Sequence, residues 1–377
     1  MNRIVLINIL YLLILIAAAL LPEGISNYNA YVLLTMSVTY LLLMRSQEVY
    51  MDTILCGGML LAVSFFRYPL YACIDTALVF FVFSSLYAGA CFRAEMCDFR
   101  LIRWTYFFVL LAMVAGMANP SFWSDGDEMR YIGIFHGGNS SASMFLMLGI
   151  AIWEMEKKEK GKGKGRVCIL LLLITITLLY MWASGTRSML FCLPYWLYQM
   201  FSRTRTRVLV ILLLTAGVFY LPVFVESIVE KMRLEEDDPS MMTRSVIYQL
   251  LLSGISDNYA LIPQGSHSGW YMIKDFTGDP TFSPHNDFLN FIYEWGVIFY
   301  LFCVIVAIKL KCFLRLNFEF ILILLALSSC ALHNILFNVI IWIPFTVILM
   351  VRRATDEIRK VCYEQSRYTI GYRKKIQ

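Results

Sequence analysis

Val167-Cys-Ile-Leu-Leu-Leu-Leu-Ile-Thr-Ile-Thr-Leu-Leu-Tyr-Met-Trp-Ala183 is an apolar run without one charged side chain. A helix needs roughly 20 mostly apolar residues to cross a bilayer. Similar runs recur along the 377 residues, of which 59% are hydrophobic and only 16% charged, whereas a soluble domain carries about 25% charged residues. The composition excludes a disordered chain, a collagen and an ordinary soluble enzyme. It predicts an all-α fold, a polytopic transmembrane helical bundle.

We expect about twelve membrane-spanning helices in a single integral membrane domain over 1–377. The first is interpreted as a retained helix, because its apolar stretch is longer than the roughly 7–15 residues typical of a signal peptide. Arg67-Tyr68-Pro69 separates the third span from the fourth, since proline disfavours helix in the residue before it. The predicted spans are 4–21, 30–44, 50–66, 70–92, 104–118, 140–153, 167–183, 188–201, 208–225, 288–308, 318–332 and 335–350.

The basic residues orient these spans, because Lys and Arg are retained in cytoplasmic loops. With both termini inside, 25 of the 32 Lys and Arg residues lie on the cytoplasmic side. They include those of the connector 154–166 and of the basic tail 351–377. We expect the connector to be a flexible charged loop. The net charge of +5 then reflects membrane orientation and contact with anionic membrane lipid, and no nucleic acid partner is expected.

Two predicted outer segments are long, 119–139 and 226–287, and the second is the large periplasmic or extracellular loop. Within it, residues 243–253 form an amphipathic stretch in which Ile247, Leu250 and Leu251 share one helical face. This pattern is typical of a helix in or near the membrane interface. None of the ten cysteines falls in a predicted outer loop. Because neither a disulfide framework nor a metal-ligand spacing is present, we expect no metal and no cofactor.

Three arginines lie on the outer side, which otherwise holds few cations. Arg187 occupies a short turn between two apolar spans, Ala183-Ser-Gly-Thr-Arg-Ser188, where it either serves a function or snorkels to the interface. Arg244 begins the amphipathic stretch and has an alternative role as a surface partner of the acidic run 235–238. Arg130 has the same alternative, beside acidic residues at 125–128. Two guanidinium groups suit a diphosphate, because each binds phosphate oxygens in a bidentate manner.

The tenth span opens with Pro284-His-Asn-Asp-Phe-Leu289. Asn286 or Asp287 at this place is by default a helix N-cap, which leaves His285 unexplained. A histidine has a pKa near neutrality and is able to act as a base. Glu294 lies further into the span, where an acid is costly unless paired, so we expect it to orient a partner. The sequence suggests no role for Asp75, the acid in the fourth span.

Three segments together resemble the O-antigen ligase and polymerase superfamily. They are Ser184-Gly-Thr-Arg-Ser-Met-Leu190, then His285-Asn-Asp-Phe-Leu-Asn-Phe-Ile-Tyr-Glu-Trp-Gly-Val-Ile298 after the large loop, and upstream Arg130-Tyr-Ile-Gly-Ile-Phe-His-Gly-Gly-Asn139. Arg244 matches the family's arginine near the start of a loop helix. The resemblance covers roughly residues 125–305 and rests on the order of the segments and the topology together. Residues 1–120 contribute only hydropathy.

The resemblance implies a bacterial inner-membrane glycosyltransferase of the C-type architecture that needs no nucleotide and no metal. Its donor would be an undecaprenyl-diphosphate-linked glycan on the outer face, and its acceptor a glycan or a lipid. By analogy, Arg187 and Arg244 would hold the diphosphate, and His285 would position or deprotonate the attacking hydroxyl. Arg130, Asn139, Asn286 and Glu294 would contribute to substrate binding. A chain-length regulator is a further expected partner.

Three functions remain open at this point. A polymerase extends another lipid-linked repeat unit, whereas a ligase transfers the glycan to the lipid A core, and these motifs do not separate the two. The short chain and modest outer loop favour the polymerase. A flippase or transporter is disfavoured, because neither inverted repeats nor intramembrane charge clusters are evident.

Overall fold

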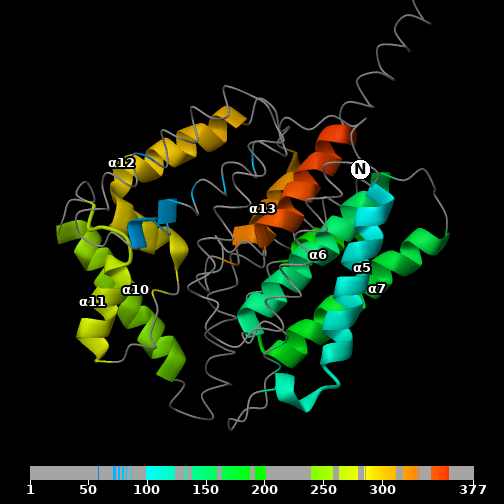
Figure 1. The fold of residues 1–377 in the computed structure, drawn as a ribbon, viewed down its shortest axis with the longest axis horizontal. Coiled ribbons are helices and arrows are strands. Elements are labelled where there is room, and N and C mark those ends of the chain that lie inside the picture. The colour runs from blue at the N-terminus through cyan, green and yellow to red at the C-terminus, as the bar shows by residue number, and fades with distance from the viewer. Residues whose placement is uncertain are drawn as a thin grey trace, which may run out of the picture.

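The computed structural model describes residues 58, 71–73, 75, 76, 79, 82, 86, 99–123, 131, 133, 138–158, 164–186, 192–200, 239–257, 263–278, 284, 286–310, 317–328, 330 and 341–355. Throughout these residues the regular structure is helical, without a strand, as Figure 1 shows. One isolated bridge pairs Trp123 with Tyr131. The predicted all-α class is therefore confirmed for this part of the chain.

The helices follow the predicted spans in order. They are α5 (Phe99–Gly116), the 3-10 turn η3 (Pro120–Phe122), α6 (Gly138–Lys158), α7 (Lys164–Ser184), α8 (Leu193–Met200), α10 (Pro239–Asp257), α11 (Ser268–Thr277), α12 (Asp287–Leu310), α13 (Phe318–Ser328) and a last helix over 341–355. Described residues between 71 and 86 are also helical. The first, second and ninth predicted spans, and almost all of the third, lie outside the described residues.

Several predicted boundaries were wrong. The sixth span was expected to be short, but α6 has 21 residues, because its charged end continues the helix instead of starting a loop. The connector 154–166 is accordingly helical up to Lys158 and again from Lys164. The described part of the last helix, 341–355, continues five residues beyond the predicted end at 350 and so enters the predicted tail. Within the described residues, α8 with 8 residues and α13 with 11 are shorter than their predicted spans, 188–201 and 318–332.

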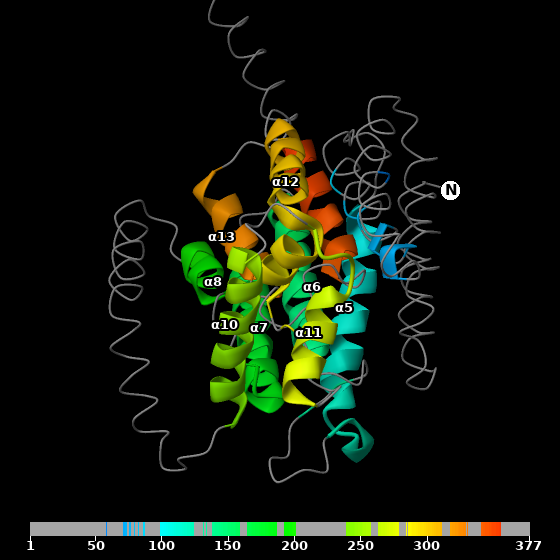
Figure 2. The same ribbon diagram turned by 90° about the vertical axis from the view of Figure 1, so that its left-hand side faces the viewer.

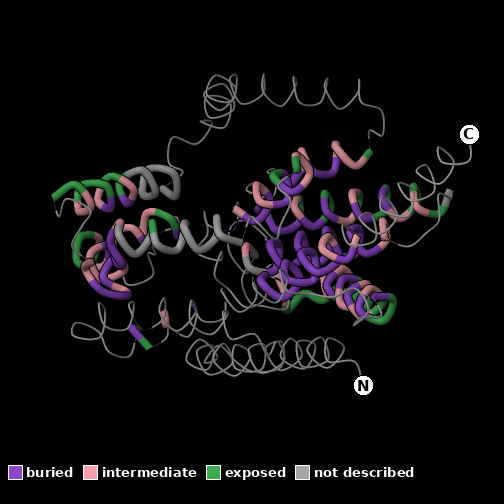
Figure 3. Tube along the Cα trace, turned by 90° about the horizontal axis from the view of Figure 1, so that it is seen from above, coloured by how far each residue is buried: buried purple, intermediate pink, exposed green. Residues whose placement is uncertain are grey.

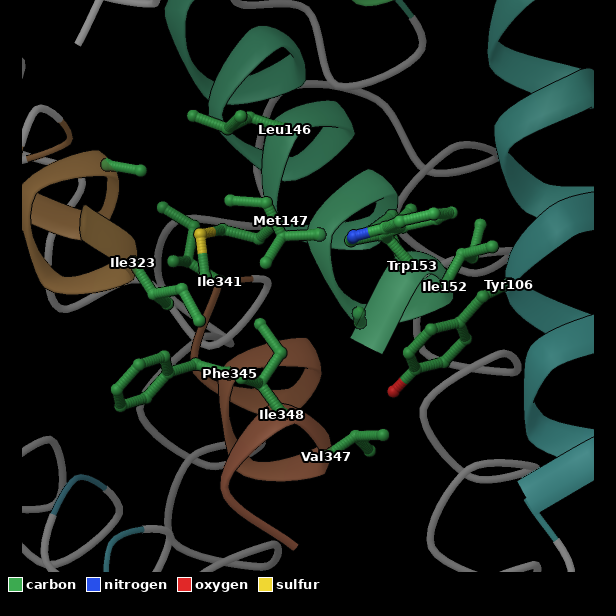
Figure 4. Packing of buried hydrophobic residues seen from close by; sticks show 14 of the residues in the cluster. Tyr106, Leu146, Met147, Ile152, Trp153, Ile323, Ile341, Phe345, Val347 and Ile348 are labelled. Atoms are coloured by element: carbon green, nitrogen blue, oxygen red, sulfur yellow. The ribbon is translucent and has the colours of Figure 1, made fainter. Parts of the chain in front are cut away.

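Helix α6 is the centre of the larger packed cluster. Every residue from Ser141 to Ile150 is buried, and α5 and α7 pack against it, side by side with it in Figures 1 and 2. A helix that is apolar on all sides is stable only when it is surrounded. Figure 4 shows Leu146, Met147 and Trp153 of α6 among residues of α5, α13 and the last helix. Figure 3 shows that buried residues concentrate where these helices meet.

Within the described part of the chain, two helices are long and apolar enough to cross a membrane, 99–116 and 165–184, and only a third of each is buried. The side of α7 that faces away from α6 carries Leu171, Leu172, Leu179 and Trp182, and Trp182 is 79% exposed. Helix α5 likewise exposes Leu101, Trp104 and Phe108. Soluble proteins rarely expose contiguous apolar surface of this kind. The two helices are suited to contact with lipid.

A network of charged side chains joins four helices at one end of this cluster. Glu154 of α6 is 4% exposed and accepts hydrogen bonds from Lys157 and from the Tyr195 hydroxyl of α8, the latter at 2.7 Å. Glu319 of α13 also pairs with Lys157, and with Arg352 of the last helix at 3.4 Å. Buried carboxylates require such partners. The network fixes α8, α13 and the last helix around the end of α6.

These contacts also fix the relative directions of the helices. Residues near the starts of α5 and α13 meet residues near the ends of α6 and the last helix, through Arg103–Glu156 and Arg352–Glu319. Neighbouring helices therefore alternate in direction. This is the alternation that the predicted topology requires. Apart from Glu319, the second residue of the predicted span 318–332, these charged residues belong to segments predicted to lie inside or to the cytoplasmic end of a span. The orientation relative to a membrane stays a prediction.

Candidate functional site

A smaller cluster gathers helices α10, α11 and α12. Ile247 and Leu251 of α10 are fully buried against Ile273 of α11, and Leu289 and Tyr293 of α12 pack around them. Of the three residues predicted to share one helical face, Ile247 and Leu251 are buried against α11 and Leu250 is partly buried. Arg244 lies within α10, whose proline at Pro239 suits a first helical turn. The interface location of this helix stays a prediction.

The start of α12 carries the predicted histidine segment. Asn286 precedes the helix, and its side-chain oxygen accepts a hydrogen bond from the Leu289 N–H at 3.2 Å. This is the N-cap predicted from the residue type. Asp287 is buried in the first turn. His285 lies outside the described residues, so its role as a base stays a prediction, as does the contact of Asn286 with substrate.

Helix α12 is broken at Gly296. Its φ of 77° and ψ of 157° lie in a region that is open essentially only to glycine. In a regular helix the carbonyl groups of Tyr293 and Glu294 would accept hydrogen bonds from residues 297 and 298. The predicted tenth span 288–308 contains this break, which hydropathy does not register. Breaks within apolar helices are frequent at functional sites.

The loop before α11 takes up the carbonyl groups at the break. The Gly265 N–H donates to the Glu294 carbonyl at 2.9 Å, and the Gln264 N–H donates to the Tyr293 carbonyl at 3.4 Å. The loop therefore replaces part of the hydrogen bonding of α12. Irregular backbone within an apolar segment is stable only when it is enclosed by protein in this way.

The carboxylate of Glu294 holds the same loop. It is 3% exposed and accepts a hydrogen bond from the Gly269 N–H at 3.2 Å, in the first turn of α11. The His267 N–H also faces it. The first N–H groups of a helix lack partners within the helix and attract negative charge. Glu294 was expected to orient a partner, and within the described residues that partner is the start of α11.

Asp75 lies next to this junction. Its carboxylate accepts a hydrogen bond from the Trp295 indole at 3.3 Å, and it interacts electrostatically with Glu294. The helical segment at 71–86 is thereby joined to the break in α12, 220 residues away in sequence. Sequence reasoning left Asp75 without a role. The signal that was present is that it and Glu294 are acids in two separate apolar spans.

A second group of residues from the predicted site segments meets where α6 begins and α7 ends. The Thr186 hydroxyl donates to the Asn139 side-chain oxygen at 3.2 Å, and the Tyr131 N–H donates to the Ala183 carbonyl at 2.9 Å. Burial raises the pKa of the Tyr131 hydroxyl, which donates to the Met113 carbonyl at 2.9 Å. Two of the three segments that carry the family resemblance are therefore in direct contact.

Glycine is required at Gly133 in this second group. Its φ is 69°, a conformation that other residues rarely adopt. A side chain there would also collide with Ser141 of α6 and with the Tyr180 hydroxyl of α7. Gly133 itself thus lies directly against both helices. Arg130 and Arg187, which flank this contact in sequence, lie outside the described residues.

The described residues of the predicted site thus fall into two packed clusters, with Asn139 at the edge of one and Asn286 and Glu294 in the other. Sequence reasoning missed the loop 264–269, Asp75 and Gly296. Among the described residues, no three His, Cys, Asp or Glu side chains gather as metal ligands would.

Comparison with known proteins adds no relative: no family model, curated protein or solved structure matches the chain. The arguments for function therefore rest on the residues themselves and on their geometry.

Proposed function

We propose that this chain crosses a bacterial inner membrane about twelve times and polymerises undecaprenyl-diphosphate-linked oligosaccharide repeat units at the outer face. The product would be an O-antigen, capsular polysaccharide or exopolysaccharide. The observation that carries the proposal is the break in α12. It falls at the Glu294-Trp-Gly296 end of the histidine segment that resembles the polymerase and ligase superfamily. The loop from the large outer segment binds there.

Two further observations support this function. The Thr186–Asn139 hydrogen bond joins the turn that leads into Arg187 to the segment that follows Arg130. The apolar residues exposed on α5 and α7 suit a protein whose donor arrives through the membrane. A lipid-linked donor needs its diphosphate at the outer surface and its lipid in the bilayer.

The proposed reaction is a single displacement. The oxygen of an acceptor hydroxyl forms a bond to the anomeric carbon of the donor, and the bond from that carbon to the diphosphate oxygen breaks. The hydroxyl proton passes to His285, and the polyprenyl diphosphate leaves with its new charge stabilised by Arg187 and Arg244. Stabilisation of developing charge is usually the largest catalytic contribution, so the arginines should matter more than the histidine.

Chain extension by the purified full-length protein in nanodiscs tests this function, with a lipid-diphosphate oligosaccharide as donor. Arg187→Lys should impair extension nearly as much as Arg187→Ala, because lysine keeps the charge but loses the bidentate geometry. Arg100→Ala, at an exposed position of α5, is the control and should extend chains normally. Full activity in Arg187→Ala would refute the role of this arginine and favour interface snorkelling.

His285→Asn separates a helix cap from a base. Asparagine caps helices well, so a purely capping histidine tolerates the change. If His285 accepts a proton, turnover should fall by about 10²–10⁴-fold while donor binding persists. Turnover near that of the wild type would leave a mechanism based on the arginines alone.

A ligase remains the second candidate, because it shares the same motifs and differs only in its acceptor. Offering the protein a lipid-linked repeat unit and, separately, a lipid A core decides between them. Transfer to the core alone would replace the polymerase with the ligase.

A further inference from the structure

Four aromatic rings from two distant segments gather beside the break in α12. The His267 ring stacks on Tyr71 with 4.0 Å between ring centroids and 6° between ring planes. The centroid of the Trp270 ring lies 5.0 Å from that of His267 and 5.0 Å from that of Tyr271. All four side chains are partly exposed. We call Tyr71, His267, Trp270 and Tyr271 the aromatic cluster.

The backbone that presents His267 is strained. Its φ of 68° places it in the left-handed region, the only positive φ of a non-glycine residue in the described part of the chain. Such a conformation costs about 1–3 kcal/mol and tends to persist at functional sites. Here the hydrogen bonds of Gly265 and Gly269 to Glu294 hold the loop on either side of His267. The junction with α12 therefore fixes the position of this ring.

The electrostatics of the cluster favour a neutral ligand. Burial lowers the pKa of His267, so its imidazole is uncharged at neutral pH. The ammonium of Lys274 lies 5.2 Å from the centre of the Trp270 ring, engaged in a cation–π contact. A phosphate site would instead need guanidinium or ammonium groups directed at the ligand. Partly exposed rings with polar edges offer an apolar surface together with hydrogen-bonding groups.

We propose that the aromatic cluster is a glycan-binding subsite that stacks against a sugar ring of the oligosaccharide. A sugar ring has an apolar C–H face for the rings and hydroxyl groups for the imidazole, indole and phenol edges. The inference rests on the proposed function and extends it to the part of the substrate beyond the reacting bond. Glu294 lies eight residues from Asn286, about 12 Å along α12.

The competing explanation is a membrane-interface anchor, because tryptophan and tyrosine concentrate at that level. Trp182 of α7 has the exposure expected of an anchor, since it is 79% exposed. The rings of the cluster instead contact one another and are partly covered. Trp182 is for this reason a matched control for Trp270.

The test measures binding of two probes to the full-length protein in nanodiscs. One is a fluorescently labelled, lipid-free oligosaccharide cut from the polysaccharide of the cells that carry this chain, and the other is a polyprenyl diphosphate without sugar. Trp270→Ala should weaken oligosaccharide binding about tenfold, the effect of losing one aromatic contact. Trp270→Phe should recover part of it. His267→Asn should weaken it too, since asparagine tolerates the left-handed backbone but lacks the ring. Trp182→Ala should bind like the wild type.

Each outcome separates the two proposals. If the wild type binds both probes and the Trp270 and His267 variants bind the oligosaccharide unchanged, the subsite is refuted and the proposed function stands. If the wild type binds the polyprenyl diphosphate but not the oligosaccharide, the subsite is likewise refuted and the proposed function stands. If neither probe binds, the proposed function fails. Quenching of Trp270 emission by brominated lipid, with no oligosaccharide effect, would identify an interface anchor.

Discussion

Gly269→Ala offers a quantitative test of the junction between α11 and α12. A β-carbon at this position would overlap the side-chain oxygen of Asn290 and stand 3.4 Å from the Glu294 carboxylate. Glycine-to-alanine changes in helices normally stabilise by about 0.5–1 kcal/mol. Overpacking costs about 1–3 kcal/mol. We therefore expect Gly269→Ala to lower the free energy of unfolding by about 1–2 kcal/mol.

Gly165→Ala is the matched control, because no atom lies within 4 Å of a β-carbon at that position of α7. It should be neutral or stabilising by up to about 1 kcal/mol. Unfolding is measured by titrating dodecyl sulfate into mixed micelles and following circular dichroism. A double-mutant cycle tests whether the overlap with Asn290 is the cause. In the Asn290→Ala background, Gly269→Ala should lower the free energy of unfolding much less than it does in the wild type. Equal stability of Gly269→Ala and Gly165→Ala would refute the close packing.

Three further predictions concern other parts of the chain. A reporter fused after residue 160 should report the cytoplasm and one at 260 the outer side, and an outer signal at 160 would contradict the topology. Lys157→Met should lower the free energy of unfolding by about 3 kcal/mol because it leaves the two carboxylates of Glu154 and Glu319 short of a partner. Arg103→Met should lower it by less, because it removes the ion pair with a single carboxylate, that of Glu156. Because the pKa of His267 is lowered in the folded protein, its contribution to stability is complete above about pH 6.5 and is lost as the pH falls below that value. The unfolding midpoint of His267→Asn should accordingly lose less on acidification than that of the wild type.

The helices were predictable because their signals are local. Runs of apolar residues such as 167–183 place α7 within three residues of its observed bounds, and the amphipathic pattern at 243–253 falls within α10. The N-cap at Asn286 followed from residue type alone. Each of these features depends on neighbours within one or two helical turns.

The site was less predictable because its contacts join distant segments. Asp75 and Trp295 are 220 residues apart, and no pattern within either span indicates the other. From hydropathy alone, α12 is predicted to be one continuous span, because a single glycine at position 296 does not interrupt the apolar run. The C-terminal end of α6 was misjudged for a related reason: Glu154 and Lys157 look solvated in sequence, whereas contacts with Tyr195 of α8 and Arg352 of the last helix bury the glutamate.

The broken helix implies an order of assembly. The carbonyl groups of Tyr293 and Glu294 accept hydrogen bonds from residues 264 and 265, and in the proposed topology these residues must first reach the outer side. Until then, unpaired carbonyl groups in lipid would cost several kcal/mol, so 287–310 should enter the bilayer as a straight helix and bend only when 264–265 arrives. Glycine at 296 permits both states, because it adopts helical and positive φ alike. A Gly296→Ala variant would then insert normally, but 287–310 would remain a straight helix and α11 would not pack against it.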